Sequence, residues 1–157
     1  MSNLLGVHIV RLLTILSLAL LISCSAPSTI KPFTTDGCSL FPDKSVISKK
    51  DWCNCCLKHD LAYWRGGTAE QRLSADKALQ ACVAETTGNK ALAELMLVGV
   101  RSGGGPYYFT TYRWGYGWPF GREYKPLTAE EIAAANKAEQ VFRDAHPRMT
   151  CEDAMQQ

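Results

Sequence analysis

Features that mark several large classes of protein are missing from this 157-residue chain. It has no run of basic residues and no patch that interleaves basic with aromatic residues, so we expect no nucleic-acid partner. It has no Gly-x-Ser-x-Gly motif, which argues against a hydrolase with that type of serine nucleophile. It has no internal repeats, and few of its segments alternate as strands do. These absences favour a mainly α fold.

A hydrophobic run long enough to cross a bilayer is also missing. Arg11 precedes an apolar run, Leu12–Ile22, which is too short for a membrane span and is typical of an export signal. The run leads into Ser23 and Cys24, and this ending resembles the signal of bacterial lipoproteins, in which the cysteine is acylated. We therefore expect residues 1–23 to be a lipoprotein signal peptide. An ordinary signal peptide with an incidental cysteine is the alternative.

The rest of the chain divides into a tether and one domain. Residues 24–35 are rich in Ser and Pro and indicate a lipidated tether, and residues 36–157 form the domain. The residue after the expected acylated cysteine is Ser25 and not Asp, which allows delivery to an outer membrane. We therefore expect an exported protein that is lipid-anchored in the bacterial cell envelope, at the outer membrane.

The cysteines point to disulfides, because export implies an oxidising compartment. Six remain once the lipidated one is set aside: Cys38, Cys53, Cys55, Cys56, Cys82 and Cys151. Six cysteines allow 15 pairings, and their spacing does not choose among them. A zinc site at the Cys-x-Cys-Cys-x-x-His cluster is an alternative. It is disfavoured because adjacent Cys55 and Cys56 point in different directions on a helix.

The most informative stretch is residues 55–63, Cys-Cys-Leu-Lys-His-Asp-Leu-Ala-Tyr. It places an imidazole, a carboxylate and a phenol on one helix, expected over about residues 50–64. Tyr63 follows His59 by four residues, so the two share a face of the helix. Asp60 lies about 100° around the axis.

A second helix is expected over about residues 69–86, antiparallel to the first. Facing residues of antiparallel helices have a nearly constant sum of residue numbers. The pair Cys55 and Cys82 and the pair His59 and Asp76 have nearly equal sums, with a midpoint near residue 68. The arithmetic therefore places Asp76 beside His59.

The residues at that midpoint have the chemistry of a turn between two helices. Gly66 or Gly67 can adopt the left-handed conformation that ends a helix. Thr68 and Gln71 form a capping box that begins the next one.

These side chains are suited to hydrolysis of an ester by activated water. His59 can accept a proton from water if Asp76 holds its other ring nitrogen. A calcium ion on Asp60, which offers the hard oxygen ligand that calcium prefers, can polarise the ester carbonyl. A buried histidine with a purely structural role is the alternative for His59.

At these residues the chain resembles the secreted phospholipase A2 superfamily, whose signature is Cys-Cys-x-x-His-Asp-x-x-Tyr. The likeness covers about residues 36–83. It implies a disulfide-stapled core of two antiparallel helices, a catalytic His59 and a calcium-binding Asp60. It also implies that Asp76 orients His59 and that Tyr63 hydrogen-bonds Asp76.

The residues before the first helix also resemble this family. The sequence Asp-Gly-Cys-Ser at residues 36–39 looks like the calcium loop of bacterial and fungal members. By that likeness, Asp36 and the carbonyl group of Gly37 join Asp60 around calcium. The glycine-rich calcium loop of animal members is absent and is replaced by residues 39–42, Ser-Leu-Phe-Pro.

The resemblance further implies a disulfide framework. The implied bridges are Cys38–Cys56 and Cys55–Cys82, which leaves Cys53 and Cys151 for a third. Many animal members have a further bridge at positions that match Ala62 and Ala75 here, so this chain lacks both cysteines of that pair.

The remaining segments add C-terminal helices and an aromatic-rich loop. Helices are expected near residues 90–100 and over residues 129–145. Residues 107–120 are dense in aromatic side chains and glycine, which indicates an irregular loop or a short hairpin. Because Trp and Tyr suit a membrane interface, we expect part of this segment at the rim of the cleft, in contact with lipid through Trp114 and Trp118.

Two functions follow from the sequence. The first is calcium-dependent hydrolysis of an acyl ester of glycerophospholipids by a monomer at a phospholipid membrane surface. The second is a non-catalytic lipid-binding or envelope-structural lipoprotein on the same scaffold. The complete set of His59, Asp60, Tyr63 and Asp76 favours the enzyme, whereas the altered calcium loop favours the alternative.

Overall fold

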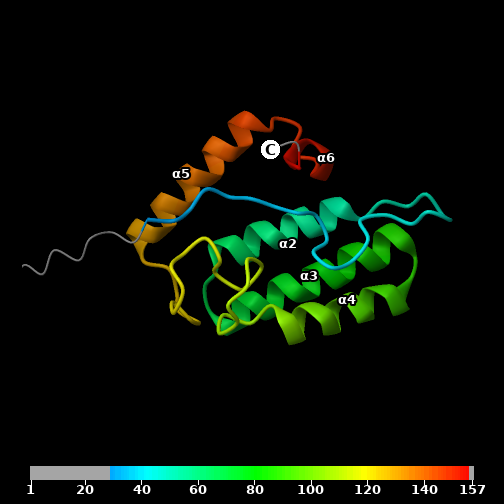
Figure 1. The fold of residues 1–157 in the computed structure, drawn as a ribbon, viewed down its shortest axis with the longest axis horizontal. Helices are drawn as coiled ribbons and strands as arrows, with labels where there is room; N and C mark the ends of the chain where they lie inside the picture. Colours follow the sequence, from blue (N-terminus) through cyan, green and yellow to red (C-terminus); the bar gives the residue numbers. More distant parts are fainter. Residues whose placement is uncertain (1–28, 156–157) are drawn as a thin grey trace, which may run out of the picture.

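The computed structural model describes residues 29–155, which form a mainly helical fold (Figure 1). Its helices are α2 (Cys53–Arg65), α3 (Ala69–Thr87), α4 (Lys90–Gly103), α5 (Ala129–Ala145) and α6 (Cys151–Ala154). Residues 29–155 contain no strand, only an isolated bridge between Lys44 and Asp51. No helix in this range is long and apolar enough to cross a membrane. The expected signal peptide and Cys24 lie outside the described residues.

The expectation of a mainly α fold is confirmed, and each of the four expected helices is present. Helix α5 has the expected bounds, and α3 extends one residue further than expected. Helix α2 begins at residue 53 rather than 50, because residues 44–51 fold into a hairpin of their own. Helix α6 was not expected, because its four residues are too few for a periodic pattern of apolar residues to predict it.

The turn between α2 and α3 forms where the sequence predicts it, but Gly66, which caps α2, has ψ −161° and does not adopt the expected left-handed helical conformation. Gly66 has φ +68° and Gly67 has φ +136°, conformations that a side chain disfavours. Thr68 then accepts the amide of Gln71, while the Gln71 side chain accepts the amide of Thr68, so the capping box is complete. This short turn returns α3 antiparallel to α2 (Figure 1).

Helix α2 lies between two hydrophobic clusters and is therefore buried on both sides. One cluster packs α2 against residues from α5 and α6 and includes Phe33, Trp64 and Phe142. The other packs α2 against α3 and α4 and includes Leu79 and Met96. Phe33 belongs to the segment that the sequence assigns to the tether, so the packed domain begins before residue 36.

Three disulfides close the fold, each with one cysteine on α2. They join Cys38 to Cys56, Cys53 to Cys151 and Cys55 to Cys82. These are the pairs that the family resemblance implies, together with the pair left over. All six cysteines of the described residues are thus oxidised, and the zinc alternative is wrong.

The aromatic segment, residues 107–120, is an irregular loop that packs on the end of α2. Trp114 is 2% exposed and Trp118 is fully buried, so the expectation that these two side chains contact lipid is wrong. Their indole N–H groups donate to the carbonyl oxygens of Gly67 and Arg65, at 2.9 and 2.6 Å. Each buried indole thus has a hydrogen-bond partner: Trp118 satisfies a carbonyl that α2 leaves without a partner at its C-terminus, and Trp114 satisfies one in the turn that follows.

Candidate active site

His59, Tyr63 and Asp76 meet in the interior between α2 and α3. The His59 Nε2 atom lies 2.9 Å from Asp76 Oδ1, and the Tyr63 hydroxyl donates to the same oxygen at 2.7 Å. Asp76 has no exposed surface, and His59 is 8% exposed. The antiparallel register therefore brings together the three residues that the sequence predicts as a set.

Two arginines complete the surroundings of Asp76. Arg101, on α4, donates to Asp76 Oδ2 at 2.7 Å. Arg72 lies one turn before Asp76 on α3 and donates to the Tyr63 hydroxyl at 2.9 Å. Sequence reasoning missed both, although the spacing of four residues between Arg72 and Asp76 is a usable signal.

These contacts keep Asp76 ionised. Burial alone would raise the pKa of Asp76, but hydrogen bonds from His59, Arg101 and Tyr63 outweigh burial and hold the pKa below its usual value. Burial and the charge of Asp76 raise the pKa of Tyr63, so its phenol stays protonated and donates. Because an ionised carboxylate only accepts hydrogen bonds, Nε2 of His59 must carry a proton. The lone pair of the neutral ring is then on Nδ1.

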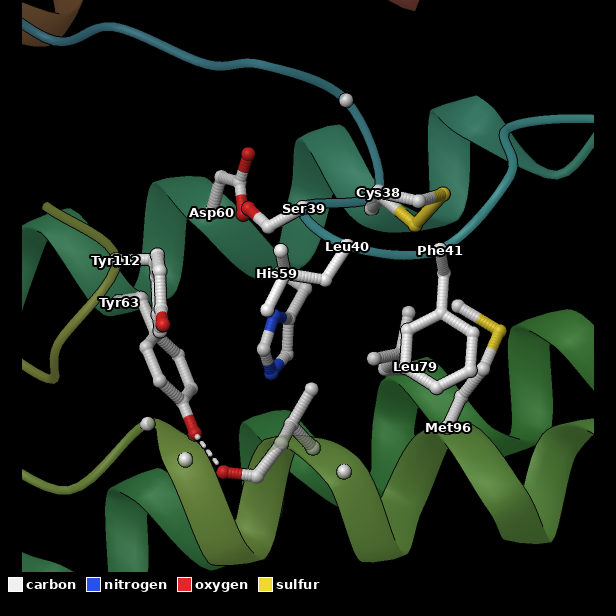
Figure 2. Close-up of a pocket in the computed structure, with 16 residues that line it drawn as sticks. Cys38, Ser39, Leu40, Phe41, His59, Asp60, Tyr63, Leu79, Met96 and Tyr112 are labelled. Carbon is white, nitrogen blue, oxygen red and sulfur yellow. Dashed lines mark hydrogen bonds between the residues drawn. A yellow bond between two sulfur atoms is a disulfide. The ribbon is translucent and has the colours of Figure 1, made fainter. Parts of the chain in front are cut away.

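A cavity opens beside His59, between residues 37–41, α2 and α4 (Figure 2). Its volume is about 140 Å³. His59, Asp60 and Tyr63 line it together with apolar side chains, among them Leu40, Phe41, Leu79 and Met96. Tyr112 also lines it, so one residue of the aromatic segment does lie at the cavity. No residue of the described chain hydrogen-bonds His59 Nδ1, the atom whose lone pair would act as a base.

Asp60 lines both this cavity and a smaller one next to it, of about 130 Å³, whose wall includes Asp36. The Thr35 hydroxyl donates to Asp60 Oδ2 at 2.6 Å. Burial, together with the charges of Asp36 and Asp43, raises the pKa of Asp60 to about 8, although the Thr35 hydrogen bond opposes the shift. No salt bridge reaches Asp60 from any part of the chain that the structure describes.

Two of the expected calcium ligands, Asp36 and Gly37, line cavities that Asp60 also lines. Asp36 lines the smaller cavity and Gly37 lines the larger one. Asp36 accepts the Ser39 hydroxyl at 2.6 Å, which orders the loop. Buried carboxylates that lack a positive partner are unstable as anions unless a cation joins them. The acidic oxygens around Asp60 are therefore suited to a hard divalent cation such as calcium.

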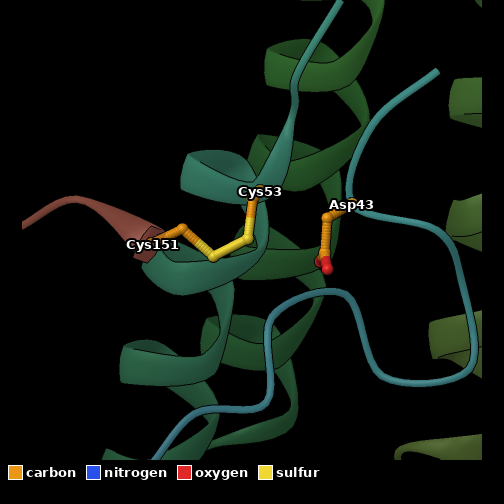
Figure 3. A group of neighbouring side chains, drawn as sticks. All are labelled: Asp43, Cys53 and Cys151. Atoms are coloured by element: carbon orange, nitrogen blue, oxygen red, sulfur yellow. A yellow bond between two sulfur atoms is a disulfide. The ribbon is translucent and has the colours of Figure 1, made fainter. Parts of the chain in front are cut away.

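A different group of metal-ligating residue types is not a metal site. Asp43, Cys53 and Cys151 lie with their ligand atoms within 4.8 Å of one another (Figure 3). The two sulfur atoms are bonded to each other, so neither is a thiolate. Asp43 Oδ1 instead accepts the amide of Cys38 at 2.7 Å and holds the loop before α2.

Sequence reasoning also missed Thr35, which adjoins the predicted set from a segment outside the helix pair, where no local pattern places it. Tyr112 belongs to the aromatic segment expected at the rim of the cleft, but the sequence did not single it out. The Tyr116 hydroxyl donates to the Thr34 carbonyl at 2.6 Å and so connects the aromatic segment to the extended segment that carries Thr35.

No protein-family model matches this chain, and neither the curated proteins nor the solved structures contain a match to it.

Proposed function

We propose that this protein is a calcium-dependent hydrolase of the phospholipase A2 type, which cleaves an acyl ester of glycerophospholipids. One observation carries the proposal. A histidine held on one ring nitrogen by an ionised, fully buried Asp76 lines an apolar cavity beside Asp60, a carboxylate without a positive partner. The first feature supplies a base, the second a cavity for an acyl chain, and the third a ligand for a cation.

The proposed reaction uses His59 as a general base. Its Nδ1 atom accepts a proton from a water molecule in the cavity while Nε2 remains bonded to Asp76. The positive charge that develops on the ring is stabilised by Asp76, which stays ionised because of Tyr63 and Arg101. The water oxygen bonds to the ester carbonyl carbon, and when the tetrahedral intermediate collapses the bond from this carbon to the alcohol oxygen breaks, so that the ring donates its proton to the departing alcohol. Calcium, when bound at Asp60, would polarise the ester carbonyl and stabilise the oxyanion.

The apolar wall of the cavity supports a fatty acyl chain as the bound group. Leu79, Met96 and Phe41 lie together at the end away from Tyr63 (Figure 2). The cavity is apolar at one end and has His59, Asp60 and Tyr63 at the other, an arrangement that suits an ester with a hydrocarbon chain on its acyl side. A lipidated Cys24 would hold the enzyme on the bilayer that contains such lipids.

The experiment is release of fatty acid from mixed phospholipid vesicles, with calcium and with a chelator. We expect His59→Ala to abolish release and Asp60→Asn to do the same, because the amide holds calcium poorly. Asp76→Asn should be less severe, since it misorients the base without removing it. Tyr63→Phe should be mildest, with the loss of a hydrogen bond worth about 1 kcal/mol.

His146 provides the matched control for this series. It lies at the end of α5, where its Nδ1 is 2.9 Å from the Phe142 carbonyl oxygen, and it lines neither cavity. His146→Ala should therefore keep full activity, and every variant should keep its disulfides and its circular dichroism spectrum. If the unaltered protein with calcium releases no fatty acid from any common phospholipid, the hydrolase proposal is wrong.

A lipid-binding protein without catalytic activity is the second candidate, and one observation favours it. Leu40, in the loop that replaces the glycine-rich calcium loop, has φ +63°, a conformation that favours glycine. The loop thus reaches this conformation without the glycines of animal members and at the cost of backbone strain. Saturable lipid binding without hydrolysis, in the same assay, would favour this candidate.

A further inference from the structure

A short hairpin before α2 presents two bare aliphatic side chains to solvent. Val46 and Ile47 are each 96% exposed. The hairpin is closed by the bridge between Lys44 and Asp51, and the Ser45 amide donates to the Lys50 carbonyl at 2.8 Å. It projects beyond the ends of the neighbouring helices (Figure 1). Tips of loops usually carry small or polar residues, so adjacent Val and Ile side chains at this tip call for a partner.

The hairpin is also fixed at its base, so the tip has a defined position. The Trp52 amide donates to the Asp43 carbonyl at 2.9 Å, and the Trp52 side chain is buried. The next residue, Cys53, is bonded to Cys151. The Lys50 ammonium donates to the Thr87 carbonyl at the end of α3, at 2.6 Å. The aliphatic tip is thus held away from the hydrophobic core.

Lysines stand on both sides of this tip, while the two nearest acids, Asp43 and Asp51, lie at the base of the hairpin and accept the amides of Cys38 and Cys53. Residues 44–50 read Lys-Ser-Val-Ile-Ser-Lys-Lys and contain no acidic residue. The Lys50 ammonium is engaged with α3, but no salt bridge in residues 29–155 involves Lys44 or Lys49. An aliphatic tip with basic residues on both sides matches the boundary of an anionic bilayer, where phosphate groups lie just outside the hydrocarbon.

We propose that Val46 and Ile47 insert into the surface of an anionic phospholipid bilayer, while Lys44 and Lys49 contact the headgroup phosphates. The hairpin and one wall of the cavity, residues 37–41, belong to one short stretch of chain, and Leu40 in that wall is 90% exposed. Insertion of the tip would hold this stretch at the lipid surface. The inference adds a membrane contact to the proposed hydrolase, and the binding that it requires does not depend on hydrolysis.

The other occupants fit less well. A stable protein interface needs about 800 Å² from each partner, far more than two aliphatic side chains supply. A second copy of this chain would bring the lysines of two hairpins together, which is repulsive. A bilayer requires only a few inserted side chains and nearby positive charge.

The first test follows the depth of the tip in vesicles that contain lipids with brominated acyl chains, which quench tryptophan. We expect Ile47→Trp in the full chain to gain emission that anionic vesicles quench. Val141→Trp is the control, because Val141 is 64% exposed but lies on α5. A lipid anchor would bring both variants to the vesicle, yet only the tip should reach the acyl chains. Equal quenching of the two positions, or none, would overturn the proposal.

The second test removes the aliphatic groups. In protein that carries Cys24→Ser and so lacks the expected lipid anchor, Val46→Ser with Ile47→Ser should weaken binding to anionic vesicles by about tenfold or more, measured by flotation. Lys44→Gln with Lys49→Gln should weaken binding to anionic vesicles and leave binding to zwitterionic vesicles unchanged. Concentration-dependent dimers that the serine variant abolishes, with unchanged vesicle binding, would overturn the proposal in favour of a second copy.

Measuring vesicle binding and fatty-acid release together separates this inference from the proposed enzyme. The His59→Ala variant should bind vesicles as the unaltered chain does. Binding without fatty-acid release, in the unaltered chain, would remove the hydrolase and keep the membrane contact. Release of fatty acid with no effect of the serine variant on binding would do the reverse.

Discussion

Two adjacent glycines at the end of α4 have different surroundings, and this difference gives a sharp test of the site. A β-carbon on Gly103 would meet no atom within 4 Å. A β-carbon on Gly104 would lie 2.6 Å from Cε1 and 2.8 Å from the hydroxyl of Tyr63. Neither glycine has a positive φ, so alanine suits the backbone at both positions. The two positions differ only in the space available for a β-carbon.

Tyr63 has little room to retreat from such a β-carbon. Its ring packs edge-on against Trp114, with 5.1 Å between ring centroids, and its hydroxyl is held by Asp76 and Arg72. On the other side, the Gly104 carbonyl accepts the Trp114 amide at 2.8 Å. Gly104→Ala must therefore displace the phenol or the end of α4, and such overpacking costs about 1–3 kcal/mol.

Gly103→Ala should have the opposite effect on stability. Replacing glycine by alanine within a helix stabilises by up to about 1 kcal/mol, because the unfolded chain loses freedom. We expect urea unfolding to show Gly104→Ala less stable than Gly103→Ala by about 1–4 kcal/mol. Gly104→Ala should also lower fatty-acid release at least as much as Tyr63→Phe does, since it moves the phenol away from Asp76. Equal stability of the two alanine variants would show that the Tyr63 ring does not occupy this position.

Three further predictions test the register, the carboxylate and the anchor. Ala62→Cys with Ala75→Cys should form a disulfide spontaneously, because the helix register places the two Cα atoms within the limit of about 7 Å; failure to close would contradict that register. In calcium-free protein, the free energy of unfolding should fall as the pH rises from about 4 to 8. The cause is that folded Asp60 keeps a proton up to a pKa of about 8, which the unfolded chain has lost; Asp60→Asn should remove this slope, and a slope that persists refutes the assignment. Mass spectrometry of membrane-extracted protein should find a diacylglyceryl group on Cys24, and a mature form that begins elsewhere would argue against the anchor.

The part of the site that lies on α2 and α3 was predictable because its causes are local. Glycines, a capping box and a four-residue spacing are read within a few positions of the chain, and together they fix the register of a helix hairpin. Once that register is set, the contact between His59 and Asp76 follows from geometry alone. The roles proposed for these residues follow from their chemistry and from the family resemblance, whereas their positions follow from the register.

The contacts that were missed depend on segments far away in sequence. Arg101 reaches Asp76 only because α4 packs along α3, and 25 residues separate the two. Thr35 reaches Asp60 from an extended segment on the other side of α2, also over 25 residues. The burial of Trp114 depended on a partner that composition does not reveal, the Gly67 carbonyl in the turn after α2. Aromatic density alone predicts neither a core nor a membrane surface, because both environments accept an indole ring and a hydrogen bond.

Helix α2 explains how so small a domain can hold a demanding site in place. Cys53, Cys55 and Cys56 all lie in its first turn, and their bridges run to three different places: α6, α3 and the loop that carries Asp36. His59 and Asp60 follow within the next turn. Catalytic geometry requires side chains to be positioned within about 0.5 Å, which needs a rigid support. In this chain the support and the proposed reacting groups, His59 and Asp60, share one helix. Selective loss of the Cys38–Cys56 bridge should therefore free the Asp36 loop and weaken calcium binding, while the Cys55–Cys82 bridge still keeps Asp76 beside His59.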